Sequence, residues 1–428
     1  MRVVPKSRCS PGWLVLASLI TVLPVLAACG SGDLGQNGWT GTVRDSAGIV
    51  VVSNEDQPLW GEGDAWTFTK LVQVGERDGP PEYQFGALSG FVMLSDGRLV
   101  IADMHSHNIR FFSPDGTYLN AVGQHGEGPG EFSGFINLLL GPGDTVLALD
   151  LRTQQGSRIS PDGEWIGSFS TLPDAAYQTS GWDDDEISRQ IVSLNRPLRE
   201  ANPEEARTDL VILRDLHGAF LDTVASFPAR ESITGTGDER LWHNWKTGAD
   251  FDLCDGMLVT AVSDAYRFVW QNLGGSVDRI VTLERDRVPF TDGDRELFLQ
   301  RVDSVSTRRR RSPAEAAWWK SRMRFEEIYP AWRRFVCGPA GSLLVQRVRP
   351  VREFTVANLP LGALPPGGEW EAFDREGRFL GVVHLPTEPH RHAFYRDPDG
   401  NWLMAGIETD ELEVEFLGTW RIDGLGTR

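Results

Sequence analysis

The sequence repeats a unit of four short apolar segments separated by turns, and this repeat limits the folds that the chain can adopt. The clearest copy spans residues 91–132, and its segments are 91–94, 99–102, 108–112 and 117–122. The turn before the last segment, at 113–116, reads Ser-Pro-Asp-Gly, which suits a type I turn with a left-handed exit. Each unit therefore predicts a sheet of four antiparallel strands.

The unit recurs along the chain with a period of roughly 50 residues, which is typical of β-propeller blades. A turn ending in Gly precedes apolar outer segments that include Tyr118, Trp165, Phe220, Val277 and Phe379. The second segments match as well, because Asp103 and Asp150 end two apolar runs that lie 47 residues apart. The predicted fold class is therefore all-β.

The two ends of the chain complement each other. After the outer segment at 379–385, the chain supplies three more inner segments, at 392–395, 402–407 and 413–417. The N-terminal region has an outer segment, 71–74, without inner partners. Joining them predicts a six-bladed β-propeller closed by N- and C-terminal strands, with no exposed sheet edge. Residues 49–53 are expected to pair at the same seam, and seven blades or an open two-domain array are the alternatives.

One segment, about 291–330, departs from the strand period and predicts a helical insertion. Residues 294–305 are amphipathic, and residues 312–315 supply an N-cap hydroxyl, Pro at the first helical position and Glu at the third. The second helix is expected to continue through Trp318, Trp319, Met323 and Phe325. This spacing gives an apolar stripe that can pack on the propeller or against a partner.

Residues 1–28 predict a signal peptide. Basic residues precede an apolar run, and Leu-Ala-Ala then leads to Cys29 in a pattern that resembles a bacterial lipobox. Cys29 is the expected lipid attachment, 29–42 a lipidated N-terminal tether and 43–422 the propeller, and an uncleaved membrane anchor is the alternative. We expect a protein of the bacterial cell envelope whose lipid attaches it to the outer membrane, facing the periplasm.

The charge balance and the cysteines narrow the possible partners. The formal net charge is −18 for the whole chain and −21 without residues 1–28, which carry three basic and no acidic side chains. This balance argues against nucleic acid as a partner. Cys254 and Cys337 can form a disulfide in an exported protein, and two free buried thiols are the alternative.

Several short motifs mark the repeats: Ala-Asp at 102–103, Asn-Ile-Arg at 108–110, the Ser-Pro-Asp-Gly turns and Gly-Glu-Gly-Pro-Gly-Glu-Phe at 126–132. They resemble NHL-type six-bladed β-propeller repeats, and the stretch 370–381 looks like the closing blades of uncharacterised propeller lipoproteins of bacteria. The resemblance implies a fold that serves scaffolds, ligand binders, lyases and hydrolases. No catalytic set transfers residue by residue.

The most suggestive cluster for chemistry is a pair of histidines. Alternate residues of an extended segment point the same way, so His105 and His107 could share a divalent metal with Asp103 or His125. Loop histidines at a blade turn are the alternative. Asp103 and Asp150 recur at matching positions, which favours turn caps over a paired general acid and base.

Two functions stay open on the sequence, which has no GxSxG, HExxH, CxxC or P-loop motif. The first is a membrane-anchored extracytoplasmic module that binds a small-molecule ligand or a protein and catalyses nothing. The second is a propeller hydrolase or lyase with its site at the central channel, with or without a metal.

Overall fold

The computed structural model describes the chain between residues 38 and 425, with gaps. The gaps are 135, 154, 171–178, 184–188, 195–207, 216–219, 229–232, 235–240, 360–368 and 390–392. The predicted signal peptide and Cys29 therefore lie outside the described residues. No helix in the described part is long and apolar enough to cross a membrane.

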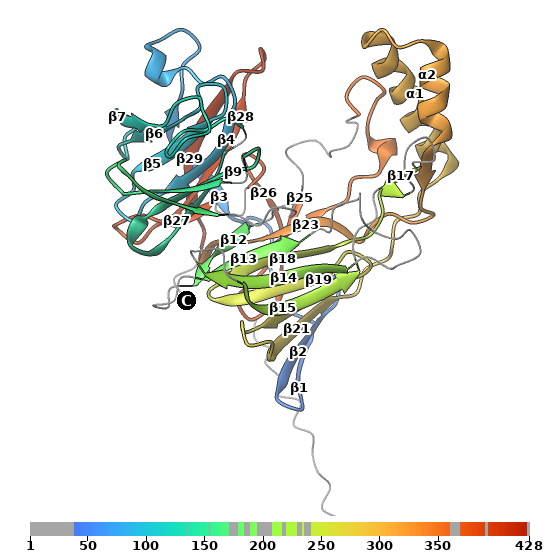
Figure 1. Ribbon diagram of the computed structural model, residues 1–428. Coiled ribbons are helices and arrows are strands. Elements are labelled where there is room, and N and C mark those ends of the chain that lie inside the picture. Colours follow the sequence, from blue (N-terminus) through green and yellow to red (C-terminus); the bar gives the residue numbers. More distant parts are fainter. Residues whose placement is uncertain are drawn as a thin grey trace, which may run out of the picture.

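Strands of the described residues form six blades of four antiparallel strands each, which confirms the predicted six-bladed β-propeller (Figure 1). Blade 1 contains β4 (Leu88–Met93), β5 (Leu99–Asp103), β6 (Asn108–Phe112) and β7 (Tyr118–Val122). Blade 2 contains β8 (Ile136–Leu140), β9 (Val146–Asp150), β10 (Gln155–Ile159) and β11 (Trp165–Ser170). Blade 3 contains β12 (Thr179–Asp183), β13 (Arg189–Leu194), β14 (Thr208–Asp215) and β15 (Phe220–Pro228).

The second half of the ring is built in the same way. Blade 4 contains β18 (Ala249–Cys254), β19 (Met257–Val262), β20 (Arg267–Gln271) and β21 (Val277–Leu283). Blade 5 contains β23 (Trp332–Cys337), β24 (Leu343–Arg347), β25 (Glu369–Phe373) and β26 (Phe379–His384). Blade 6 contains β27 (Phe394–Arg396), β28 (Trp402–Thr409), β29 (Glu415–Asp423) and β3 (Thr67–Val74).

The turns that mark the repeat have the geometry expected from their sequence. Six of them place a glycine in the left-handed region, with φ between +84° and +88°: Gly97, Gly116, Gly163, Gly275, Gly377 and Gly400. A side chain at such a position is strained, which is why glycine recurs there. In the blade 1 turn, the N–H of Gly116 donates to the carbonyl of Ser113 at 2.9 Å.

The sixth blade is assembled from both ends of the chain, as the sequence predicts. β3 pairs antiparallel with β29, and Val74 lies opposite Leu417. Both side chains are buried in a hydrophobic core with Phe91 of blade 1. The ring is thus closed by hydrogen bonds between head and tail, and blades 6 and 1 pack together.

Residues 49–53 do not pair at that seam, and this expectation is wrong. They belong to β2 (Ile49–Asn54), which pairs parallel with β21 of blade 4, and β1 (Thr42–Ser46) adds an outer strand. Burial explains the choice, because Val52 packs in the core between blades 4 and 5. The Asn54 side chain, 3% exposed, donates to the carbonyl of Gly377 at 2.9 Å and accepts from the N–H of Phe379 at 2.8 Å.

The helical insertion contains α1 (Asp292–Arg308) and α2 (Pro313–Ser321), each of which begins with a capping box. α2 ends at Ser321, so the expected continuation through Met323 and Phe325 is wrong. Those residues form β22 (Met323–Phe325), which pairs parallel with β17 (Leu241–Asn244), beside β16 (Ile233–Thr234). Figure 1 shows α1 and α2 together at one side of the molecule, away from blade 1.

Candidate functional site

Asp103, at the end of β5, is a fully buried hydrogen-bond acceptor. Its carboxylate accepts hydrogen bonds of 2.7–3.1 Å from the N–H groups of Gly86, Ala87 and His105 and from the hydroxyl of Ser106. Burial would raise the pKa of Asp103, but these hydrogen bonds outweigh it and hold the pKa below its ordinary value. The carboxylate links the crossover before β4 to the turn after β5, so Asp103 has a structural role as a turn cap.

Asp150, at the end of β9, is likewise a buried acceptor of backbone hydrogen bonds. It accepts hydrogen bonds of 2.7–3.2 Å from four backbone N–H groups, those of Ser133, Gly134, Arg152 and Thr153. The two carboxylates therefore cap equivalent turns in neighbouring blades. Nothing in these contacts aims either of them at a substrate.

His105 and His107 do not lie on an extended segment. The chain turns between β5 and β6, and His107 has a left-handed backbone with φ of +53°, so strand alternation does not align the two rings. The His107 ring packs edge-on against His125, with centroids 4.6 Å apart. Among the described residues, no group of three His, Cys, Asp or Glu side chains could hold a metal ion.

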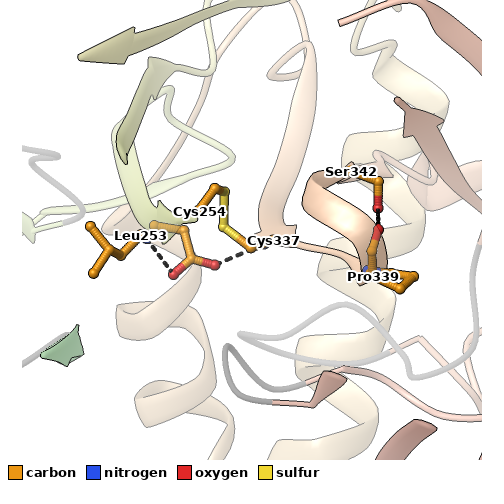
Figure 2. The surroundings of a disulfide bond; sticks show 6 residues. Leu253, Cys254, Cys337, Pro339 and Ser342 are labelled. Carbon is orange, nitrogen blue, oxygen red and sulfur yellow. Dashed lines mark hydrogen bonds between the residues drawn. A yellow bond between two sulfur atoms is a disulfide. The ribbon is translucent and has the colours of Figure 1, made fainter. Parts of the chain in front are cut away.

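Cys254 and Cys337 are joined by a disulfide, with their Cα atoms 5.4 Å apart (Figure 2). They end β18 and β23, the first strands of blades 4 and 5. Asp252 reinforces this link, because its carboxylate accepts from the N–H of Leu253 at 3.0 Å and of Cys337 at 2.9 Å. The bond is a covalent connection between neighbouring blades.

Glu371, on β25, is another fully buried carboxylate, and the sequence does not single it out as a site residue. Tyr266 donates its hydroxyl to it at 2.5 Å, and it pairs with Arg285 and, at 3.5 Å, with Arg347. Burial raises the pKa of Glu371, and these three partners offset only part of that effect. A raised pKa in a cleft can mark a catalytic acid. Here the carboxyl is sealed between blades 4 and 5, where it locks them together.

The helical insertion contains a pocket of about 420 Å³, which we call the insertion pocket. Its walls come from α1, α2, β17 and β22, so two crossovers of the propeller, before and after blade 4, meet to form it. The apolar lining consists of Trp242, Phe298, Val302, Val305, Trp319 and Met323. This volume and lining are those of a small-molecule site.

The pocket rests on a small hydrophobic core of its own. Phe298 and Val302 of α1 are buried against Tyr329 and Leu359, which lie outside the two helices. Asp294, also fully buried, completes the capping box of α1 and pairs with Arg352, which lies between β24 and β25. These contacts fix α1 to the propeller, and Phe298 and Val302 contribute both to this core and to the pocket lining.

Two tryptophans, Trp242 and Trp319, line the insertion pocket, and Trp318 packs against both of them. Trp242 of β17 lies 4.5 Å from Trp319 and 5.8 Å from Trp318 of α2, measured between ring centroids. Trp318 keeps 38% of its surface exposed. Flat aromatic faces at an open pocket offer large contact area to a ligand at little cost in side-chain entropy.

The polar part of the lining is basic. Arg301, Arg309 and Arg311 reach the pocket together with Asn244 and Ser306, and no acidic side chain is among the described lining residues. The site thus combines an aromatic wall with positive charge. It lacks the carboxylates, thiols and paired histidines that acid–base or nucleophilic catalysis uses.

Comparison with protein families agrees with the fold. The family model described as a 6-bladed beta-propeller matches residues 84–149, which are blade 1 and the first part of blade 2. A Bacteroides fragilis protein named as exported is 10% identical over 87% of this chain and 99% of that one, with a TM-score of 0.47. No curated protein matches the sequence.

Two enzymes are also among the similar solved structures. Virginiamycin B lyase of Staphylococcus aureus is 10% identical over 84% of this chain and 96% of that one, with a TM-score of 0.36. A gluconolactonase of Xanthomonas campestris is 11% identical over 79% of this chain and 87% of that one, with a TM-score of 0.37. At these values the likeness bears on neither substrate nor activity.

The sequence points only to part of the insertion pocket. Trp319 belongs to the predicted apolar stripe, but Trp242 lies in the crossover after blade 3, about 80 residues away in the chain. Arg309 and Arg311 fall in a basic run of four arginines that reads as an exposed helix end. Only the fold brings the two segments together.

Proposed function

We propose that the protein is a ligand-binding propeller that works outside the cytoplasm and binds its ligand in the insertion pocket. The observation that carries this proposal is the pocket itself, because the insertion departs from the blade repeat and is built around an open, aromatic-walled cavity. Inserted crossover segments are where a propeller can acquire function without disturbing its sheets.

The proposed location rests on two features. The lipobox-like sequence before Cys29 supports export and a lipid anchor in the cell envelope. The Cys254–Cys337 disulfide suits an oxidising compartment. A Cys29→Ser variant should leave the membrane fraction of the cells and appear in the soluble extracytoplasmic fraction, and retention in the membrane would contradict the lipid anchor.

Binding is tested with N-phenyl-1-naphthylamine, a neutral apolar fluorophore. We expect a saturable rise in fluorescence at one probe per protein. Val305→Trp, which fills part of the pocket, should weaken this binding at least tenfold. Ala317→Trp, on the exposed surface of α2, is the matched control and should leave it unchanged. Equal binding by all three proteins would place the probe elsewhere and remove the pocket from the proposal.

A further inference from the structure

We infer that the insertion pocket selects an anion carried on a flat apolar body, such as an aromatic or other apolar small molecule with a carboxylate, phosphate or sulfonate group. This inference rests on the proposed function and adds the chemical class of the ligand. It depends on the charges around the pocket, the pairing of the nearby acidic residues and one unpaired hydroxyl.

The insertion is basic in an acidic protein. Residues 291–330 contain nine basic and seven acidic side chains, a formal net charge of +2, whereas the whole chain carries −18. A local excess of the opposite sign attracts anions and raises their local concentration. The rest of the molecule repels them, so the potential alone would direct an anion to this part of the surface.

The acidic residues near the pocket already have partners. Asp303 pairs with Lys320 at 2.8 Å, and Glu315 is held in the capping box of α2 by Ser312. Arg301, Arg309 and Arg311 form no ion pair within the described part of the chain. None of the three arginines is therefore held in a direct ion pair with a described residue, although the pKa of Glu315 is lowered by its hydrogen bonds with Ser312 and, to a lesser extent, by the charge of Arg311.

Two of these arginines, Arg301 and Arg311, are held near the cavity by different contacts. Arg301 donates its Nε to the carbonyl of Leu359 at 2.6 Å, which leaves its terminal nitrogens for other acceptors. Arg311 stacks on Trp319, with its guanidinium carbon 5.1 Å from the ring centroid. Burial and the nearby charge of Arg308 both lower the pKa of Arg301, as expected of a cation without a counter-charge.

Ser306 supplies an independent sign of a polar ligand. It lines the pocket from α1, is 2% exposed, and its Oγ has no hydrogen-bond partner among the described residues. A buried hydroxyl without a partner is costly. An anionic oxygen in the pocket would accept a hydrogen bond from it and remove that cost.

The apolar lining of the pocket determines the size and polarity of the uncharged part of the ligand. Trp242, Trp319, Val302 and Val305 give the cavity an apolar floor, and about 420 Å³ is enough for a small molecule of two or three rings. A cavity of this size encloses a single small molecule. We therefore assign the site to a free anionic compound and not to the surface of an anionic membrane.

The test compares two probes that share one body. 8-Anilinonaphthalene-1-sulfonate is N-phenyl-1-naphthylamine with an added sulfonate, so the ratio of their affinities measures recognition of the anion. Arg309→Gln/Arg311→Gln should weaken binding of the sulfonate probe at least tenfold and of the neutral probe less than twofold. Ser306→Ala should weaken only the sulfonate probe, by about threefold to tenfold.

Arg308→Gln/Arg310→Gln is the matched control. It removes the same charge from the same run of four arginines, but neither residue lines the pocket. We expect a loss of less than threefold for the sulfonate probe, since only long-range attraction changes. Equal losses in the two double variants would show general attraction by a basic surface and overturn the inference.

The remaining outcomes separate this inference from the proposed function. Pocket-dependent binding of the neutral probe, with no loss of sulfonate binding in Arg309→Gln/Arg311→Gln, would overturn the anion preference and leave the binding module standing. Failure of the wild-type protein to bind either probe would overturn both. Vesicles containing phosphatidylglycerol give the last arm: binding to them that both double variants weaken equally would reassign the arginines to a membrane surface.

Discussion

Blades 1 and 5 place opposite charges at equivalent positions. In blade 1, Asp103 ends the second strand and pairs at 3.4 Å with Arg110 on the third. In blade 5, the residue at the end of the second strand is Arg347, and it pairs at 3.5 Å with Glu371 on the third. The strand registers of the two blades superimpose these pairs, so the same ion pair is present with its charges reversed.

The difference follows from the connection between the second and third strands. In blade 1 a tight turn brings the hydroxyl of Ser106 and the N–H of His105 to Asp103. Together with two N–H groups of the crossover before β4, they lower the pKa of Asp103 although it is buried. In blade 5 a long segment replaces that turn, and the carboxylate sits on a strand with Tyr266 and Arg285 of blade 4 as its partners. The hydrogen-bond donors to Asp103 thus lie in blade 1 and in the crossover that leads into it, whereas Glu371 of blade 5 bonds to residues of blade 4.

The largest effect should come from the covalent link that blade 5 has and blade 1 lacks. Cys254→Ala/Cys337→Ala should lower the free energy of unfolding by about 4 kcal/mol, because the bond closes a loop with a sequence separation of 83. Urea unfolding of the wild-type and variant proteins measures this. A reducing agent should destabilise the wild type and leave the variant unchanged.

Asp103→Asn should cost about 3 kcal/mol, because it leaves the Arg110 side chain, only 6% exposed, without a counter-charge. Asp162→Asn is the control, since this side chain is 85% exposed and should change stability by less than about 0.5 kcal/mol. If the two variants unfolded at the same urea concentration, the local cap in blade 1 would not matter for stability.

Arg347→Ala should cost only about 1 kcal/mol, because Arg347 is 39% exposed and Arg285 still pairs with Glu371. Its counterpart in blade 1, Arg110→Ala, should cost more, since Asp103 has no second arginine. Urea unfolding of the two variants tests the comparison directly. A larger loss for Arg347→Ala would reverse our assignment of the stronger pair to blade 1.

The two carboxylates should also give opposite pH dependences. The pKa of Asp103 is lowered in the folded state, so its contribution is present above about pH 4 and is lost as the pH falls through the folded value. The pKa of Glu371 is raised, so the folded state binds its proton more tightly than the unfolded state. Its stabilising contribution is present below the unfolded pKa and is lost as the pH rises through the folded one.

Glu371→Gln makes that difference measurable. Glutamine cannot ionise, so the variant should gain stability relative to the wild type as the pH rises from about 4.5 towards neutral. Asp103→Asn should instead approach the wild type as the pH falls below about 4. Thermal unfolding across this pH range tests both, and parallel curves for Glu371→Gln and the wild type would contradict the raised pKa.

The sequence predicts the ring better than the features attached to it. Glycine turns such as 113–116 recur from blade to blade. The three inner strands left over at the C-terminus lack an outer strand, and the outer strand at the N-terminus completes their blade. The pairing of residues 49–53 cannot be predicted in this way, because a short apolar strand can add to any open sheet edge. The hydrogen bonds of the Asn54 side chain to Gly377 and Phe379 select the edge of blade 4. The insertion pocket could not be predicted either, because Trp242 reaches it only through the pairing of β17 with β22 in the folded chain.

The path of the N-terminal segment has a mechanical consequence. Residues 42–54 pair along blade 4, Leu59 and Trp60 bond to the backbone of β26 in blade 5, and β3 then completes blade 6. If the chain is tethered at Cys29 as proposed, a pull on that tether would enter the described structure through β1 at the rim of blade 4. From there the force would pass along residues 42–74, which bond in turn to blades 4, 5 and 6. Three neighbouring sheets would therefore share the load.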